Sequence, residues 1–402
     1  MPSQENYAIR PLNTGDVEQY NALLRYAFQI TEQELSECGW QDDEIKQSKF
    51  PVLERADVLG CFDGNDLVSQ IAVYPLKMNI YGVVYPVGFV TSVCTYPEYS
   101  GRGIMKRLMH QSLEHMRQRQ QPVALLFPYS IPLYRKMGWE IISNKISYTV
   151  KDRQIPSQLQ APGRVHRVTW DNEDFRNLHA QFAAATHGCL FRNALAWEEY
   201  WRWDEDDTVV AIYYDAAGKP SGYMVYLIKD DIMYVKEMIY LTREAQQGLW
   251  EYIHAHDSMI DEVRGSSYYS DPIAFELDDG DIRETIRPYI MGRIVDAEQF
   301  FPKYRCDPTA ENVTIAFEIE DHFLPWNNKT VTVLFHRGEC SLSAAAAKHH
   351  VKLSIATLTA LMLGYKTAAK LQRLGRIEGE ERTVRLLDDV LLHEAPYISD
   401  YI

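Results

Sequence analysis

The sequence predicts an α+β protein with more than one folded unit, and three observations support this. The chain has 402 residues, which is long for a single hydrophobic core, so two or three domains are expected. Runs rich in β-branched and aromatic residues follow one another through short turns near the N-terminus, as in an antiparallel sheet. One run then leads through a glycine-containing turn into a helical pattern and a further strand. Such a crossover joins parallel strands, so the sheet should be mixed.

The bulk composition is that of a globular protein with an acidic surface. The chain is 46% hydrophobic and 24% charged, with a net charge of −15. This charge repels phosphate backbones, so no nucleic-acid partner is expected; it suits a cationic partner, but equally serves solubility. The six cysteines have no zinc-type spacing, so we expect no metal and reduced, mostly buried thiols in a cytoplasmic protein. No apolar run of about 18 residues is present, so no membrane partner is expected.

The first unit is expected to cover residues 1–150. A short strand at 7–12 precedes a helix from Thr14 to about Gln29. Strands follow at 58–63, 67–80 and 86–96, with Gly64-Asn65 as a hairpin turn between the first two. Apolar residues at i, i+3 and i+4 spacing predict a long helix from Ile104 to about Gln120. A buried strand at 124–127, a short helix at 131–139 and a last strand at 139–150 complete the unit.

Two further units are expected at 151–291 and 292–402. Residues 151–164 contain two prolines and no periodicity, which indicates a linker. A strand pair around Asp230-Asp231 and a helix at 243–256 then partly repeat the first unit, but without a Gly-x-Gly turn. The last unit has strands at 312–321 and 329–338 and helices at 354–365 and 382–392. Its C-terminus is apolar and aromatic, whereas free tails are normally polar, so we expect it to dock.

The turn before the long helix has the features of a phosphate cradle. Gly101 and Gly103 leave room for an anion, and the helix that starts at Ile104 points its backbone N–H groups at it. Arg102, Lys106 and Arg107 add positive charge. The turn is not a Walker loop, because the pattern G-x-x-x-x-G-K-[ST] is missing. It is not the dinucleotide fingerprint either, because Lys106 stands where the third glycine would be. A capping turn with a solvated basic face remains the alternative.

A second motif follows at residues 133–140, where Tyr134 lies four residues before Gly138-Trp139. Strand, glycine turn, helix, strand and Tyr-x-x-x-Gly-aromatic together resemble the GCN5-related N-acetyltransferase (GNAT) superfamily, whose members bind acetyl-coenzyme A. Ser100 and Met105 depart from that family's usual turn. The whole chain resembles the Eis (enhanced intracellular survival) type, with two GNAT-like mixed-sheet units, the second degenerate, and a sterol-carrier-protein-like α/β domain. The resemblance also implies a hexamer.

Residue by residue, the resemblance implies a coenzyme site and two catalytic groups. The strand backbone at Val93, Cys94 and Thr95 would face the thioester and pantetheine. The pyrophosphate would be held by the turn and first helical residues, namely Gly101, Arg102, Gly103, Ile104, Met105 and Lys106. Tyr129 and Ser130 would lie near the coenzyme at the end of the next strand. Tyr134 would be the general acid, and the terminal carboxylate of Ile402 the general base.

These roles are physically reasonable for acetyl transfer by direct attack of an amine. The amine must lose a proton, and a departing thiolate with a pKa near ~8.5 leaves more easily beside a proton donor such as a tyrosine. An N–H at a bulge of the 86–96 strand would stabilise the oxyanion. A terminal carboxylate, with a pKa of about 3.5, is a weak base unless burial raises it or water relays the proton. Ordinary packing of Tyr134 and a docked but inert tail are the alternatives.

We therefore predict an acetyl-CoA-dependent N-acetyltransferase of a cationic amine, such as an aminoglycoside-like or polyamine-like molecule or a lysine. The acidic stretch 37–44 would attract such an amine, or is a solvated helix start. His254 and His256 do not share a helix face, so they predict no metal site. Residues 358–365 line a lipid pocket or form plain core. A lipid- or sterol-binding protein and a non-catalytic coenzyme A sensor are the alternative functions.

Overall fold

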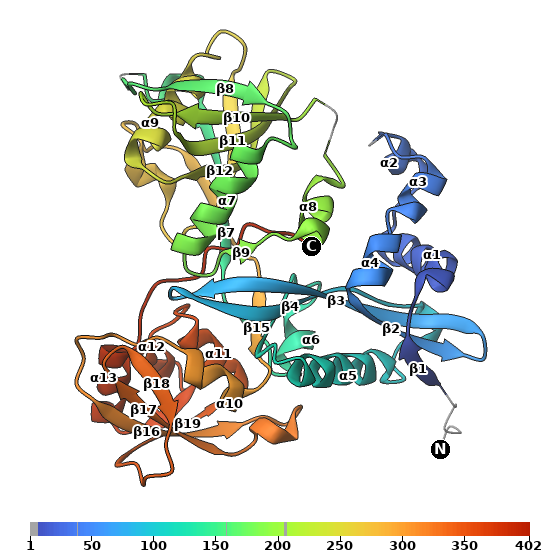
Figure 1. The fold of residues 1–402 in the computed structure, drawn as a ribbon, viewed down its shortest axis with the longest axis vertical. Coiled ribbons are helices and arrows are strands. Elements are labelled where there is room, and N and C mark those ends of the chain that lie inside the picture. The colour runs from blue at the N-terminus through green and yellow to red at the C-terminus, as the bar shows by residue number, and fades with distance from the viewer. Residues whose placement is uncertain (1–6, 38, 158, 205–206) are drawn as a thin grey trace.

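The computed structural model of the chain describes residues 7–402 except 38, 158, 205 and 206. In this part, the strands form three sheets, of eight, seven and five strands, which confirms the predicted mixture of sheets and helices. Figure 1 shows the first sheet in blue across the middle, the second in green and yellow above it, and the C-terminal unit in orange and red below. The three sheets follow the order of the three predicted units.

The first sheet carries helices on both faces. Its strand order is β1-β2-β3-β4-β5-β15-β6, and β9 pairs with β3. The strands are β1 Ala8–Pro11, β2 Asp57–Asp63, β3 Asp66–Ile80, β4 Val83–Thr95, β5 Val123–Leu126, β6 Glu140–Ile141, β9 Leu190–Phe191 and β15 Met291–Ile294. The helices are α1 Val17–Phe28, α2 Glu32–Glu37, α3 Asp42–Gln47, α4 Phe50–Arg55, α5 Ile104–Gln118 and α6 Ile131–Arg135. The apolar face of α5 packs in one core cluster and that of α1 in another, so the two helices cover opposite faces.

The strand predicted over 139–150 is wrong as a single element. It breaks after β6, and β7 (Asn144–Lys151) joins the second sheet. The chain changes sheets at Ile142 and Ser143, where backbone hydrogen bonds tie both residues to Ile290. β15 in turn enters the first sheet between β5 and β6. The predicted domain boundaries at 150 and 291 therefore fall within β7 and β15, two strands that connect units. The domain limits themselves remain a prediction.

The second sheet has the order β14-β7-β13-β12-β11-β10-β8. Its other strands are β8 Arg164–Val168, β10 Val209–Tyr214, β11 Pro220–Lys229, β12 Ile232–Tyr240, β13 Glu262–Ser267 and β14 Arg283–Pro288. The helices are α7 Glu173–Ala185, α8 Ala194–Trp201 and α9 Arg243–His254. Asp230 and Asp231 form the predicted hairpin turn, both with positive φ angles.

The third sheet has the order β18-β17-β16-β19-β20. Its strands are β16 Val313–Glu320, β17 Thr330–His336, β18 Glu339–Leu342, β19 His349–Ser354 and β20 Ile377–Gly379. The helices are α10 Ala297–Phe300, α11 Ile355–Met362, α12 Ala368–Arg373 and α13 Glu381–Val390. Every residue of α11 is buried, and the helix packs on β15 and β6 of the first sheet. The apolar run around residues 354–365 is thus interface core.

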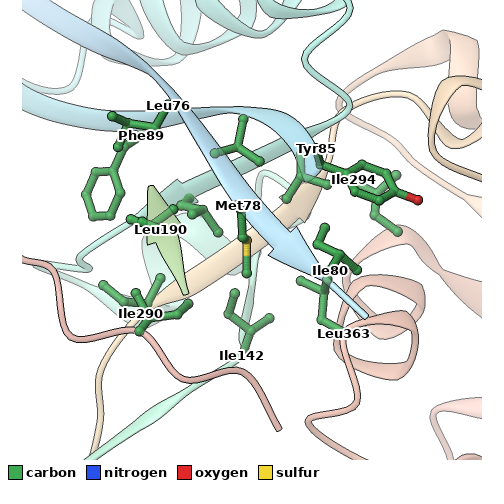
Figure 2. Packing of buried hydrophobic residues seen from close by; sticks show 14 of the residues in the cluster. Leu76, Met78, Ile80, Tyr85, Phe89, Ile142, Leu190, Ile290, Ile294 and Leu363 are labelled. Carbon is green, nitrogen blue, oxygen red and sulfur yellow. The ribbon is translucent and has the colours of Figure 1, made fainter. Parts of the chain in front are cut away.

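Apolar side chains from all three units meet at one junction. Figure 2 shows Met78 and Ile80 of β3 in one cluster with Leu190 and Ile290 of the second unit and Leu363 of the third. This shared core fixes the units relative to one another, because burial of apolar side chains is the main stabilising contribution at such contacts.

Two predictions about composition can be compared with the structure. Cys61, Cys94, Cys189, Cys306 and Cys340 are free and buried, as expected, while Cys38 lies outside the described residues. Within the described ranges, no helix has both the length and the apolar character needed to cross a bilayer.

Candidate functional site

Two neighbouring strands of the first sheet part at one end and leave an open backbone edge. The parallel pairing of β4 with β5 stops at Val90 and Leu126, whereas β4 continues to Thr95. The Cys94 carbonyl accepts a hydrogen bond from Ser69 on β3, at 2.8 Å. Since successive peptide groups of a strand point to opposite sides, those of Val93 and Thr95 face the parted edge. This edge can pair with an extended ligand.

The expected bulge lies at the same point of β4. Gln70 pairs with Cys94 and Ala72 with Thr91, so Ser92 and Val93 together oppose a single residue of β3. Ser92 has a φ of 54°, in the left-handed region. The Tyr20 hydroxyl of α1 lies 3.1 Å from the Ser92 hydroxyl and supports the bulge. Bulges of this kind re-aim backbone groups beside functional sites.

The glycine turn forms an open concavity at the N-terminus of α5. Gly101 and Gly103 both have a φ of 77°, and a Cβ on either would meet nothing within 4 Å. The first N–H groups of any helix lack an intrahelical partner, and Gly103, the N-cap of α5, has no side chain that could accept a hydrogen bond from them. The Ile104 side chain is buried in the α5 core and Met105 packs beside it, so both offer only backbone groups here.

The basic side chains of the turn take different positions. Arg102 donates to the Tyr7 hydroxyl at 2.5 Å and to the Glu98 carbonyl at 2.9 Å. Its guanidinium thus lies against the protein, next to the turn. Lys106 is exposed, with its Nζ 5.9 Å from the centre of the Phe323 ring. Both charges raise the positive potential near the α5 N-terminus, which favours an anion there.

Tyr134 lies on α6, below the parted strands. Its side chain is 5% exposed. Burial, with a smaller contribution from the nearby Cys94 thiol, raises the pKa of Tyr134 to about 12, so the hydroxyl keeps its proton at neutral pH. Gly138 ends this motif because a Cβ there would collide with the Arg293 guanidinium. Tyr129, by contrast, is 97% exposed, and Ser130 is the N-cap of α6.

The C-terminal residues pack beside the same strands. Ile402 lines a cavity of about 410 Å³ together with Thr91 and Ser92 of the β4 bulge. The Tyr401 ring stands edge-on to Phe127, directly after β5, with 5.0 Å between ring centres. Figure 1 shows the tail leaving the C-terminal unit and ending near α8. The terminal residue therefore lies beside the β4 bulge, and Tyr134 lies near Cys94 of the same strand.

A buried ion cluster that the sequence did not indicate holds the tail in place. Arg192 donates to Asp400 at 2.6 Å and makes two hydrogen bonds to Glu237 on β12, at 2.6 and 3.0 Å. All three side chains are at most 3% exposed. The Ser399 hydroxyl also donates to Glu237, at 2.8 Å. Because these residues are distant in sequence, only the folded chain shows the cluster.

Comparison with known proteins identifies the class. Family models described as acetyltransferase (GNAT) domains match residues 8–142 and 188–294, and one described as a sterol carrier protein domain matches residues 297–399. An uncharacterized N-acetyltransferase of Streptomyces avermitilis is 23% identical over 429 residues, covering 100% of both chains.

Solved structures share the fold over the full length. A probable N-acyltransferase of unknown function from Enterococcus faecalis V583 has 26% identity and a TM-score of 0.90, covering 99% of this chain and 100% of that one. Eis1 from Mycobacterium abscessus has 19% identity and a TM-score of 0.81, covering 98% and 100%.

The chain belongs to the GNAT acetyltransferases, since the two matched GNAT domains together cover more than half of it. Its domain order, two GNAT domains followed by a sterol carrier protein domain, goes with a fold that it shares with Eis1 over nearly the full length. The second unit, which looked like a partial repeat without the glycine turn, is therefore a GNAT domain. GNAT acetyltransferases take their acetyl group from acetyl-CoA.

Proposed function

We propose that this acetyltransferase transfers acetyl from acetyl-CoA to a primary amine by direct attack, with Tyr134 as general acid and the Ile402 carboxylate as general base. One observation carries the proposal: Ile402 lines the cavity beside the β4 bulge, and Tyr134 is close enough to Cys94 of the same strand for the thiol to affect its pKa. A donor and an acceptor of protons thus lie near the same strand.

The residues at this edge fit acetyl-CoA, which supplies an acetyl group activated as a thioester. Gly101 and Gly103 leave open space where a pyrophosphate needs it, and the N–H groups of residues 104–106 face that space. Arg102 and Lys106 contribute charge. The peptide groups of Val93 and Thr95 are proposed to pair with an extended arm. Tyr129 and Ser130, between β5 and α6, are proposed to border its far side.

Tyr134 acts mainly as a dependable hydrogen-bond donor. Its pKa of about 12 exceeds the ~8.5 of an ordinary thiol, so complete transfer of its proton to a thiolate is uphill. The buried hydroxyl nevertheless stabilises negative charge as it develops on the leaving sulfur, and donors of this kind contribute about 10²–10⁴ in rate. A bulge N–H of β4 would stabilise the carbonyl oxygen in the same step.

The Ile402 carboxylate accepts the proton that the acceptor amine must lose. An ordinary alkylamine has a pKa near ~10.4, so the amine arrives as an ammonium ion that a carboxylate attracts and orients. Removal of the proton, directly or through a water, leaves the nitrogen lone pair free to attack. The docked tail keeps the carboxylate beside the bulge.

The site also bears on the alternative functions. A lipid-binding role drew on residues 358–365, but α11 is packed between the first sheet and the third. Among acceptors, a cationic molecule such as an aminoglycoside, a polyamine or a lysine is the proposal that the resemblance supports. A hexameric, cytoplasmic enzyme is proposed on the same basis, and light scattering of the purified protein tests the hexamer.

Release of coenzyme A thiol tests this proposal with a panel of primary amines. We expect Tyr134→Phe to lower kcat at least 100-fold without a change in melting temperature. We expect a chain that lacks Tyr401 and Ile402 to lose activity at least tenfold. Tyr26→Phe, at a site 58% exposed, is the matched control and should retain full activity. The proposal fails if no amine supports turnover, or if both active-site variants match the wild type.

A further inference from the structure

The cavity beside the terminal carboxylate has walls suited to an apolar molecule of modest size. It measures about 410 Å³ and lies between α1, the β4 bulge, α8 and the tail. Buried side chains form its inner wall, namely Tyr20, Leu24, Ile45 and Tyr74. Phe28 and Trp203 are half-exposed at its border. Such a lining, with a few polar groups, is typical of small-molecule sites.

Two oppositely charged side chains in the cavity wall, Glu199 and Arg202, neutralise each other. Glu199 of α8 accepts two hydrogen bonds from Arg202, at 2.8 and 2.9 Å, and one from the Tyr74 hydroxyl at 2.8 Å. Burial raises the pKa of Glu199, but the positive charges of Arg202 and Lys49 lower it by more. The net pKa is below the ordinary value, so the carboxyl stays ionised. Glu199 and Arg202 thus form a neutral pair, which leaves little charge for a ligand.

Lys49 is different, because its charge has no direct partner. It lies just before α4, lines the cavity and is 9% exposed. Its Nζ makes no hydrogen bond or ion pair with any residue that the structure describes. Burial and the neighbouring Arg202 lower the pKa of Lys49 to about 8, against the opposing effect of Glu199, so it remains mainly protonated at pH 7. An unpaired buried ammonium is costly unless something binds it.

The Ile402 carboxylate is a second charge of the cavity without a direct partner. Across the described part of the chain, no hydrogen bond or ion pair to it is found. Arg25 and Glu34 also line the cavity, and the Glu34 carboxylate accepts hydrogen bonds from the Thr31 N–H and hydroxyl. Lys49 and Ile402 therefore offer a cation and an anion that do not pair with each other. A ligand that matches both must carry opposite charges and an apolar body.

We propose that the acceptor carries an anionic group, bound by Lys49, in addition to the amine that faces Ile402. This inference rests on the proposed function and narrows it: the acceptor is an amino acid-like molecule with an apolar body. It differs from the polycation that the resemblance implies, because a second ammonium would face Lys49 and meet repulsion instead of attraction. A carboxylate is the simplest group to use as a probe.

Matched series of acceptors test this directly. Turnover is measured with ω-amino acids, n-alkylamines and α,ω-diamines of equal chain lengths. For the wild type, we expect kcat/KM to be highest for an amino acid, at least tenfold above the diamine of the same length. Lys49→Met should lower kcat/KM for amino acids at least tenfold and change that for alkylamines less than threefold. Methionine is unbranched and fills a similar volume, which limits disruption of packing.

Lys46→Met is the matched control. Lys46 is on α3, close in sequence, and its Nζ lies 2.9 Å from Glu18 and 3.1 Å from Asp43, away from the cavity lining. The Lys46→Met substitution removes the same charge from the same region. The preference of this variant for amino acids should therefore equal that of the wild type. If Lys46→Met loses the preference as well, a diffuse charge effect replaces the proposed contact and the inference is overturned.

Calorimetry with hexanoate separates the inference from the proposed function. We expect hexanoate to bind the wild type and Lys46→Met equally and Lys49→Met at least tenfold more weakly. Binding of this pattern without turnover of any amine would refute the acetyl-transfer proposal while the anion site stands. Turnover that is as fast with diamines as with amino acids, with hexanoate binding unaffected by Lys49→Met, would overturn the inference and leave the acetyltransferase intact.

Discussion

The two GNAT domains share a strand with a bulge followed by a helix, but they treat the helix N-terminus in opposite ways. In the first domain, Gly103 caps α5 without a side chain. In the second, the Thr242 hydroxyl caps α9 by accepting a hydrogen bond from the Ala245 N–H at 3.1 Å. In the second domain, the Thr242 side chain thus occupies the position at the helix N-terminus that an anion can occupy in the first domain. Loss of the cradle needs only a self-capping residue, with the fold unchanged.

The open strand edge is also treated differently. The bulge of β4 in the first domain borders a cavity. The bulge of β12, between the pairs Val225–Glu237 and Tyr226–Val235, is next to Glu237, whose carboxylate binds Arg192 and Ser399. Ser399 and Asp400 of the tail therefore bind residues of the second domain, and the residues that follow them reach the first domain. The domain without a cradle is thus the anchor for the other domain's proposed base.

The largest effect is expected from breaking that anchor with Arg192→Met. The change leaves Glu237 and Asp400 buried without their counter-charge, which should lower the free energy of unfolding by about 3–5 kcal/mol. Urea denaturation measures it. Arg264→Met, which removes an exposed partner of Glu262, should cost less than about 1 kcal/mol. Equal stabilities of the two variants would show that the buried cluster is not an anchor.

A pH titration sharpens the comparison, because the tail also passes a buried histidine. His187 accepts the Tyr81 N–H at Nδ1 and lies 3.1 Å from the Leu363 carbonyl at Nε2, while its own carbonyl binds the Tyr397 N–H. Burial lowers the pKa of His187 to about 4, with the Leu363 hydrogen bond opposing it. The unfolded chain, with a pKa near ~6.5, binds more protons between these values, so stability is present above pH 6.5 and is lost as pH falls toward 4.

We expect His187 to contribute a loss on the order of 3 kcal/mol, measured as the unfolding free energy at intervals between pH 7 and 4. His179, which is buried on α7 and whose pKa burial lowers to about 3, adds a loss of similar size in the same window. His187→Gln should therefore reduce the slope by about half, even if its stability at pH 7 is lower. His350→Gln, at an exposed position, should leave the slope unchanged. A wild-type profile without a slope between pH 6.5 and 4 would contradict the expected role of His187.

Local patterns explain what the sequence predicted well. The apolar spacing after Ile104, the Gly101 and Gly103 turn and the β-branched strands are each signals within about 15 residues, and the structure bears out these elements. The docked tail was predictable because an aromatic, apolar terminus has to be buried somewhere. The roles of Tyr134 and Ile402 come from the resemblance and stay proposals.

Features that depend on distant partners were out of reach. No local signal marks the break at Ile142, because its cause is Ile290, far along the chain. Arg192 and Glu237 look like ordinary surface charges until the fold buries them together. Lys49 likewise stands in a short turn between α3 and α4 with no local signal, and only the folded structure shows that its ammonium lacks a partner. Long-range pairing of strands and charges is decided by tertiary packing.

The cradle itself can be tested with Gly103→Ala. The φ of 77° disfavours any side chain by roughly 1–2 kcal/mol, and a Cβ would also enter the space proposed for the pyrophosphate. We expect KM for acetyl-CoA to rise at least tenfold. Gly218→Ala is a strain-matched control, with a φ of 81° and nothing within 4 Å of its Cβ, in the β10–β11 turn of the second domain. It should lose similar stability and keep the wild-type KM; an equal KM in both variants would locate the coenzyme elsewhere.

The smallest effect is expected from Thr242→Ala, the converse change in the second domain. Loss of the hydroxyl leaves the Ala245 N–H without its cap, which should cost about 1 kcal/mol of unfolding free energy, while Thr242→Ser should restore most of it. KM for acetyl-CoA should not change in either variant, because the α9 terminus is proposed to bind only its own side chain. An altered KM would mean that the second domain still takes part in coenzyme binding, and a stability loss alone would confine coenzyme binding to the turn at Gly101 and Gly103.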